Sequence, residues 1–288
     1  MQLDLATILL QWSAGGLAFL WITTRGRLVS LGYGWLLRGI YGAIAVGAFA
    51  AELFADHRGA GHALFLAGSV GVVVSALGAL VVSVVRRRAG VGAARAARVR
   101  ARARVAAMAG NVESGRAEPD SAVREFPPAL DLLAPIAGAV GLIGAAEFSG
   151  GSLWLAAARL LVGAAFLGAV TDAMLLGHWY LTQPGLPREP LKELVGWSAG
   201  VLPAEVLVML VPPGMVGVIS GARSDGYDGL LGWMWVVCAI TTGILLWVTW
   251  LALRERFYSA VMAATGLLYL AILTAAGTDL VARAVLTP

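Results

Sequence analysis

The sequence predicts an all-α fold, a polytopic transmembrane helix bundle of about eight spans with both termini outside the cell. Three observations predict it. Hydrophobic residues make up 59% of the 288 residues and charged residues only 13%, against about 45–50% and about 25% in a typical soluble domain. The apolar residues come in long blocks, and a bilayer core needs roughly 20 apolar residues per helix. Basic residues are distributed unevenly among the connections, as is typical of membrane proteins.

Turn residues and charges divide the chain into the predicted spans. The separators are short runs rich in Gly, Pro, Asp or Arg. The shortest is Ser149–Ser152, and the count would fall to seven if the helix continued through it. We find no convincing internal sequence repeat. The predicted spans are 6–24, 33–55, 63–85, 129–148, 152–179, 194–219, 230–252 and 258–282.

The distribution of arginine sets the expected orientation. When the connections are assigned to alternate sides, 17 of the 21 basic residues fall on one side and 3 on the other, while Arg159 lies within a span. Cytoplasmic connections carry the excess of Lys and Arg, so that side is expected to be cytoplasmic. The predicted location is the plasma membrane, and the excess of Arg, Ala, Gly and Val suggests a bacterial inner membrane.

One long connection, 86–127, separates a three-span segment, 1–85, from a five-span segment, 128–288. It carries a dense run of arginines, Arg86–Arg104, with alanines between them. Such a run either anchors the loop on the cytoplasmic side or docks anionic lipid or an acidic protein partner. Nucleic acid is not an expected partner, because no aromatic residue interleaves with the arginines.

Two acids inside predicted spans, Asp172 and Glu205, are the candidate proton or cation sites. An ionisable side chain in lipid is costly, so one inside a span needs a reason. With the predicted boundaries both acids lie in the inner half of the membrane at comparable depth. Arg38, near the inner end of the second span, is a candidate counter-ion. A structural role, in which each acid is paired with a hydroxyl, a backbone group or an arginine, is the alternative.

The sixth predicted span contains Pro203 and the pair Pro212-Pro213. Proline removes a backbone donor and kinks a helix, and the freed carbonyls then need water, a neighbouring helix or an ion as partner. Transporters use such broken helices, and so do bundles with no transport role.

The end of the fifth predicted span is the most distinctive stretch. Met174 and His178 share a helix face at i and i+4, and Trp179 and Tyr180 fit the interfacial aromatic belt. His178 is a candidate contact for a haem, a quinone or a lipid headgroup, or a cap of the helix end. Residues 177–181 read Gly-His-Trp-Tyr-Leu, a motif that resembles uncharacterised bacterial multispan membrane proteins; the resemblance covers this short stretch and implies no activity.

Two histidines and two acids flank the turn between the second and third spans, namely Glu52, Asp56, His57 and His62. These residue types can ligate zinc, but their spacing matches no established site, and we predict no metal site. The chain contains neither a phosphate-binding Gly-Lys-Ser/Thr loop nor His-Glu-x-x-His, and both are common marks of catalysis. The sequence therefore favours a non-catalytic protein over an enzyme.

Three functions stay open from the sequence. The first is passage of a small solute or ion across the membrane, with Asp172 and Glu205 as proton or cation sites. The alternative is a non-catalytic or redox-associated membrane subunit of a larger complex, in which His178 contacts a haem or quinone. The third is a lipid-modifying membrane enzyme, which no sequence motif supports.

Overall fold

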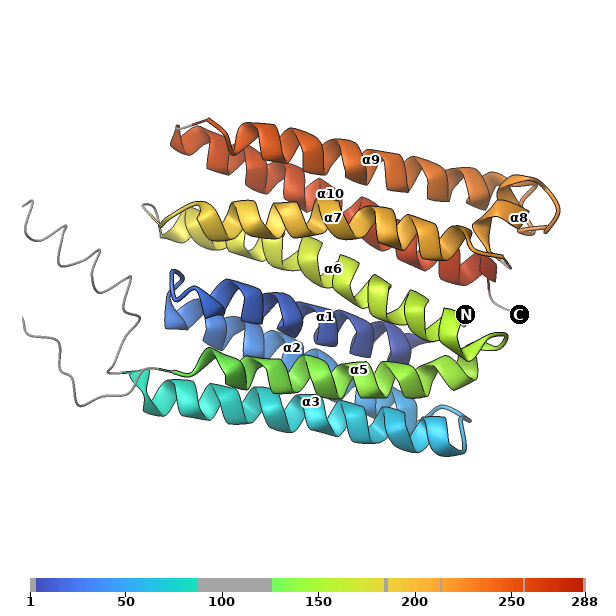
Figure 1. Cartoon of the computed structure of the whole chain (residues 1–288), viewed down its shortest axis with the longest axis horizontal. Coiled ribbons are helices and arrows are strands. Elements are labelled where there is room, and N and C mark those ends of the chain that lie inside the picture. Colours follow the sequence, from blue (N-terminus) through green and yellow to red (C-terminus); the bar gives the residue numbers. More distant parts are fainter. Residues whose placement is uncertain (1–3, 88–125, 184–185, 213, 256, 287–288) are drawn as a thin grey trace, which may run out of the picture.

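The computed structural model describes residues 4–87, 126–183, 186–212, 214–255 and 257–286, and every regular element among them is a helix. Eight helical segments are long and apolar enough to cross a membrane. They lie side by side, with the start of the first and the end of the last at the same end of the bundle (Figure 1). We call this the terminal end, and the opposite end, where residues 87 and 126 lie, the loop end.

The prediction of eight spans is confirmed. The elements are α1 (Leu5–Arg25), α2 (Leu31–Leu53), α3 (Ala60–Val85), η2 (Pro128–Leu132), α5 (Leu133–Ala146), η3 (Glu147–Ser149), α6 (Leu153–Thr182), α7 (Glu189–Leu210), α8 (Met215–Ile219), α9 (Leu230–Ala252) and α10 (Tyr258–Leu286). The short 3-10 helices η2 and η3 extend α5 at its two ends, and together the three form one span.

Two details of the prediction are settled by backbone chemistry. The turn between η3 and α6 is a true break, because Gly150 and Gly151 have φ of +68° and +72°, a region that glycine enters without strain. The predicted span 194–219 was wrong at its C-terminal end. The helix α7 ends at Leu210, since Pro212 has no N–H with which to continue it.

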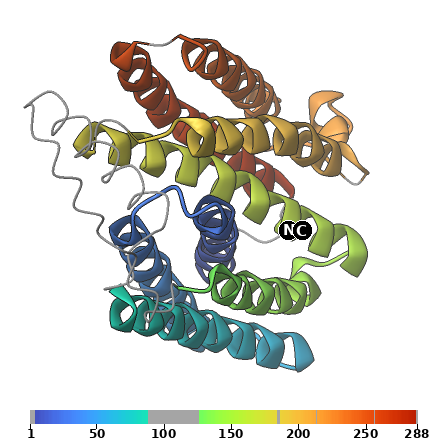
Figure 2. The same ribbon diagram turned by 60° about the vertical axis from the view of Figure 1, so that its left-hand side comes forward.

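The helices pack as two units with the same order of neighbours. In the first unit α1, α2, α3 and α5 each contact the next, and α5 returns to α1; in the second unit α6, α7, α9 and α10 do the same, and α10 returns to α6. Figure 2 shows the second unit above the first. The connection 86–127 therefore joins α3 to α5 within the first unit, and the repeated architecture is one that the sequence did not reveal.

The two units meet where α1 crosses α6, a contact that we call the seam. A Cβ atom on Gly15 would lie 1.8 Å from the carbonyl oxygen of Ala164, and one on Gly168 would lie 2.2 Å from the carbonyl carbon of Gly15. Glycine is therefore required for the two backbones to approach so closely. Beside the crossing, the Trp12 indole N–H donates a 2.8 Å hydrogen bond to the Thr171 hydroxyl.

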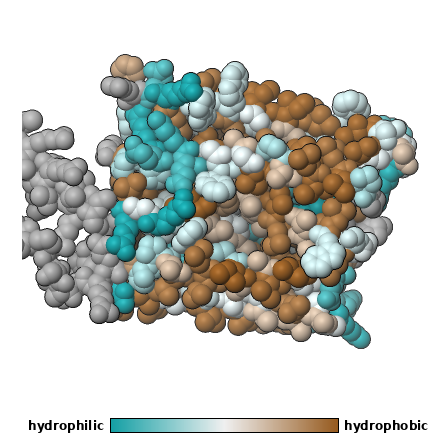
Figure 3. Space-filling model, viewed as in Figure 1, coloured by the Kyte–Doolittle hydropathy of each residue, from teal (hydrophilic) through white to brown (hydrophobic). Residues whose placement is uncertain are grey.

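The outer surface of the bundle is apolar along its length. Hydrophobic residues cover most of the face shown in Figure 3, and hydrophilic residues gather at its two ends, more of them at the loop end. Side chains such as Leu273 and Val74 are 69% and 64% exposed in the middle of their helices. Exposed apolar surface of this extent in a soluble protein would drive association, whereas in a membrane it faces lipid.

The connection from α8 to α9 is organised by one carboxylate. Asp225 accepts hydrogen bonds from the backbone N–H groups of Tyr227 (2.9 Å), Gly229 (2.8 Å), Leu231 (2.8 Å) and Gly232 (3.4 Å). The bond from Gly229, with help from the others, holds the pKa of Asp225 below its usual range. The start of α9 is thus tied to the loop before it.

Candidate functional site

Asp172 lies at the seam, on α6, and is completely buried. Its Oδ1 accepts a hydrogen bond from the hydroxyl of Tyr41 on α2. The hydroxyl of Tyr33, two turns earlier on α2, donates to the backbone carbonyl of Asp172 at 3.3 Å. No described residue donates a hydrogen bond to its Oδ2. Asp172 is therefore a buried carboxyl with one polar partner and no arginine or lysine bonded to it within the described chain.

The position of Tyr41 is set by α1. A Cβ on Gly16 would lie 2.0 Å from the Tyr41 ring, so the ring occupies the space that this glycine leaves. The Ser13 hydroxyl also donates to the Tyr41 carbonyl at 2.8 Å. Because α1 contacts both α2 and α6, small residues on α1 hold the Tyr41 hydroxyl against Asp172.

A second polar cluster lies nearer the terminal end of the seam. Asp279 and Arg283 are one turn apart on α10 and form a 2.7 Å ion pair from Arg283 Nε to Asp279 Oδ2. Gln11 of α1 donates to Asp279 Oδ1 at 3.3 Å and accepts from Arg283 Nη2. Gly163 of α6 leaves room for Gln11, since a Cβ there would lie 2.2 Å from the amide nitrogen. All three polar side chains are buried.

Glu205 of α7 is completely buried beside this cluster. Neither of its carboxylate oxygens accepts a hydrogen bond from a described residue. The charged groups that act on it are Asp279, Arg283 and Arg159. Glu205 thus has no hydrogen-bond partner among the described residues, whereas Asp172 has one.

Arg159 of α6 caps the end of α7. Its Nε donates to the Val208 carbonyl at 3.0 Å and its Nη2 to the Val211 carbonyl at 2.7 Å. Val208 is four residues before Pro212, which has no N–H to offer its carbonyl. The arginine therefore supplies a donor that the proline removes, and its positive charge lies at the negative end of the helix dipole.

Two expectations about these acids were wrong. Glu205 lies five residues before the end of α7, at the terminal end, whereas Asp172 lies ten residues before the loop end of α6. The two acids are at different depths because α7 starts earlier and ends earlier than the sequence predicted. Arg38 is not their counter-ion, since both of its bonds to a carboxylate go to Asp131, at 2.7 Å each.

The Arg38–Asp131 pair is a structural tie at the loop end. Both side chains are buried, and Asp131 Oδ2 also accepts a 2.9 Å hydrogen bond from the Thr24 hydroxyl. The guanidinium lies 4.5 Å from the centre of the Phe126 ring. The pair joins α1, α2 and η2 where the chain re-enters the bundle. Asp131 was not among the residues predicted from the sequence, although an acid at the start of an apolar segment is a visible signal, as is the i, i+4 spacing of Asp279 and Arg283.

The residues around His178 are not brought together in one site. The His178 ring is exposed and its Nδ1 pairs with the Tyr269 hydroxyl at 3.1 Å. Trp179 packs on Tyr33 at 5.8 Å between ring centres, and the Tyr180 hydroxyl donates to the Pro187 carbonyl at 2.6 Å. Met174 packs against the hydrophobic core. A contact of His178 with haem, quinone or a headgroup stays a prediction.

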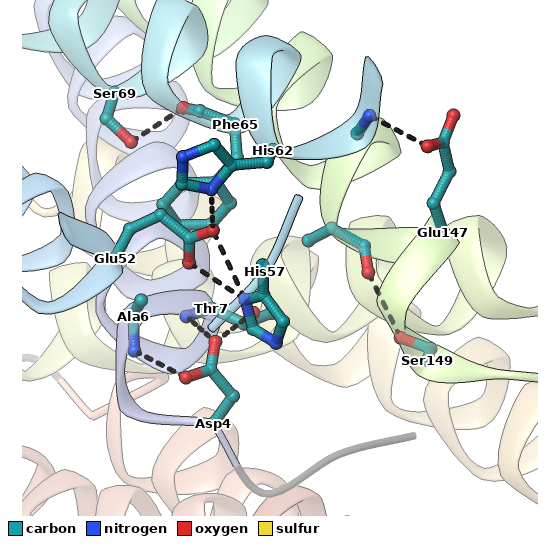
Figure 4. A network of polar contacts seen from close by, with 12 residues as sticks. Asp4, Ala6, Thr7, Glu52, His57, His62, Phe65, Ser69, Glu147 and Ser149 are labelled. Carbon is teal, nitrogen blue, oxygen red and sulfur yellow. Dashed lines mark hydrogen bonds and ion pairs between the residues drawn. The ribbon is translucent and has the colours of Figure 1, made fainter. Parts of the chain in front are cut away.

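At the terminal end, Glu52 contacts both histidines of the turn between α2 and α3. The buried Glu52 lies 2.8 Å from His62 Nδ1 and 3.2 Å from His57 Nδ1, and Figure 4 shows both rings turned toward it. The His57 ring also stacks on Phe148, with 4.0 Å between ring centres. Within the described residues no group of three His, Cys, Asp or Glu side chains could hold a metal ion. The cluster joins the α2–α3 turn to η3.

Residues 196–200 read Gly-Trp-Ser-Ala-Gly, the Gly-x-Ser-x-Gly pattern that serine hydrolases place on a strand-to-helix turn. Here the segment lies inside α7, and the buried Ser198 hydroxyl donates to the Leu194 carbonyl of its own helix at 2.9 Å. The context that would activate this serine is therefore missing from the described structure.

The eight long apolar helices are compatible with a polytopic α-helical membrane protein. Comparison with protein-family models, with curated proteins and with solved structures finds no match.

Proposed function

We propose that this protein passes a small solute or ion across the membrane in company with a proton, and that Asp172 is the group that binds and releases this proton. The observation that carries the proposal is the setting of its carboxyl, which is completely buried at the seam. Among the described residues it is bonded to Tyr41 alone, and one of its oxygens has no partner.

The chemistry of this setting suits a change of protonation. A carboxyl deprived of water and of a cation is stabilised in its neutral form. It can therefore take up a proton without first breaking an ion pair. When it ionises, the Tyr41 hydroxyl donates to the charge. Ionisable groups in such positions inside membrane bundles commonly serve proton or ion pathways.

The location supports the same role. Transporters built from two similar units bind substrates and coupling ions near the middle of the membrane, where the units meet. Asp172 lies at such a junction, between the first and second units. Glu205 lies nearer the terminal end with Arg159 and Arg283, and we propose it as a second proton site on the same route. The break after α7 provides the interrupted helix.

The arginine distribution supports an orientation. We propose that the loop end faces the bacterial cytoplasm, since it carries the basic connections. Arg25, Arg188 and Arg254 lie there among the described residues. The proposed docking of anionic lipid or an acidic partner on Arg86–Arg104 concerns a segment mostly outside the described residues, because only Arg86 and Arg87 belong to them.

The test is proton movement into liposomes that contain the purified protein and a trapped pH-sensitive dye, driven by an imposed membrane potential. We expect Asp172→Asn to lower the flux at least about tenfold, because the amide cannot take up the proton. Thr249→Val is a matched control, since its hydroxyl is buried but bonds only to Leu245 of its own helix. Infrared spectra should show a carboxylic C=O band that titrates in the wild type and is missing in Asp172→Asn. Wild-type flux in Asp172→Asn would overturn the proposal.

A further inference from the structure

A groove separates α7 from α9 on the membrane-facing surface of the second unit. Its volume is about 260 Å³ and its lining is almost entirely apolar. The residues that form it include Gly196, Ala199, Leu202, Gly243, Trp247 and Trp250. The α7 part lies in the first half of that helix and the Trp residues lie in the last two turns of α9. The groove is thus in the loop-end half of the membrane.

Small side chains create the groove. A Cβ on Gly196 or Gly200 would meet no atom within 4 Å, and one on Gly243 would touch only Leu202, at 3.4 Å. Val195 and Leu246 close the floor and are buried in the core. Trp247 and Trp250 stand at the α9 side and are 61% and 40% exposed. In a bilayer, an open space lined by apolar side chains is filled by an apolar group. A lipid acyl chain is long and narrow and therefore fits into a groove.

Positive charge lies at the loop end of this groove. The Arg254 guanidinium is stacked over the Trp250 ring at 3.6 Å. Lys192 is exposed one turn before Gly196, hence on the same face of α7, and no described residue forms an ion pair with it. Of the acids nearby, Glu193 is engaged by Arg25. Glu189, three residues before Lys192, and Glu255, beside Arg254, are exposed and lower the positive charge, while Arg188 lies at the same end and adds to it.

We infer that this groove binds one acyl chain of an anionic phospholipid whose headgroup lies between Lys192 and Arg254. The site matches the two parts of such a lipid. The apolar groove takes the acyl chain, and the two basic side chains contact the anionic headgroup at the membrane interface. A basic residue near an anionic lipid surface contributes about fivefold in binding. The inference does not depend on proton transport.

The test is retention of lipid by the delipidated protein, measured by native mass spectrometry with equal amounts of phosphatidylglycerol and phosphatidylcholine. We expect one retained phosphatidylglycerol, preferred by about twenty-fivefold if both cations contribute. Lys192→Gln with Arg254→Gln should remove the preference. Gly196→Leu should fill the groove and abolish retention, since a Cβ there meets no atom within 4 Å and the rest of the side chain would extend into the space that the lipid chain would occupy.

Gly266→Leu on α10 is the matched control, because its Cβ also meets nothing within 4 Å and it lies outside the groove. It should retain lipid as the wild type does. The charge variant alters only exposed side chains, so it keeps the test valid even if Gly196→Leu fails to fold. Equal retention of the two lipids by the wild type, unchanged retention in Gly196→Leu, or a dimer that occupies the groove in place of lipid would overturn the inference.

Discussion

Asp131 at the loop end and Asp172 at the seam are both buried aspartates, yet their surroundings are opposite. Both oxygens of Asp131 are bonded by Arg38, and Thr24 adds a third hydrogen bond. Asp172 has one hydroxyl partner for one oxygen. The two carboxylates are therefore equally buried but differ in the number of hydrogen-bond donors that contact them. An acid inside the membrane therefore suggests a functional role when its partners leave its protonation state free to change. It suggests a structural role when its partners hold it in one protonation state.

The largest expected effect comes from making the same substitution at the two aspartates. Asp131→Asn leaves the buried Arg38 without a compensating charge and should lower the free energy of unfolding by about 3–5 kcal/mol. Asp172→Asn removes no ion pair and should change it by less than about 1 kcal/mol. Thermal unfolding of the purified proteins in one detergent measures both.

A double replacement controls this comparison. Arg38→Met with Asp131→Leu removes the pair as a whole, and buried pairs replaced by apolar residues often lose little stability. We expect the double variant to recover most of the loss in Asp131→Asn. Equal destabilisation by the two single Asn variants would contradict the distinction between the two acids.

A smaller effect is expected from the hydroxyl that serves Asp172. Tyr41→Phe removes the only described hydrogen bond to that carboxyl and should lower the free energy of unfolding by about 1 kcal/mol, with a reduced proton flux. Tyr33→Phe is the control, because its hydroxyl bonds the backbone carbonyl of Asp172 and not the carboxyl. If Tyr33→Phe lowered the flux as much as Tyr41→Phe, the carboxyl contact would not be the reason.

The smallest expected effect concerns an acid in water. The folded pKa of Asp225 lies below its usual value because of the hydrogen bonds from Gly229 and its neighbours. Its stabilising contribution is therefore present above the unfolded pKa of about 3.9 and is lost as the pH falls through the lower folded pKa. The Tm of Asp225→Asn should lie below that of the wild type at pH 6, and the difference should shrink as the pH approaches about 3. A difference independent of pH would contradict this.

The sequence predicted the spans well and the contacts between them poorly. Long apolar blocks and the Gly150–Gly151 turn were enough for eight helices, since bilayer thickness sets their length. Pro212 is visible in the sequence, but the predicted span continued past it, whereas α7 ends at Leu210. For this reason the depth of Glu205 in the membrane was predicted wrongly. The contacts of Asp172 with Tyr41, of Asp131 with Arg38 and of Asp279 with Gln11 could not be foreseen, because these partners lie 131, 93 and 268 residues away. Such pairings depend on which helix faces meet, and the mostly apolar faces do not indicate this.

The crossing of Gly15 and Gly168 has a mechanical consequence. Two backbones in contact at one point can turn about it but cannot slide through it or separate without losing the packing there. A movement of one unit relative to the other that keeps this contact is a rocking motion, in which the gap that opens at the loop end closes at the terminal end. In such a movement the glycines at the seam would be the pivot, and a bulky residue at either position would push the two helices apart.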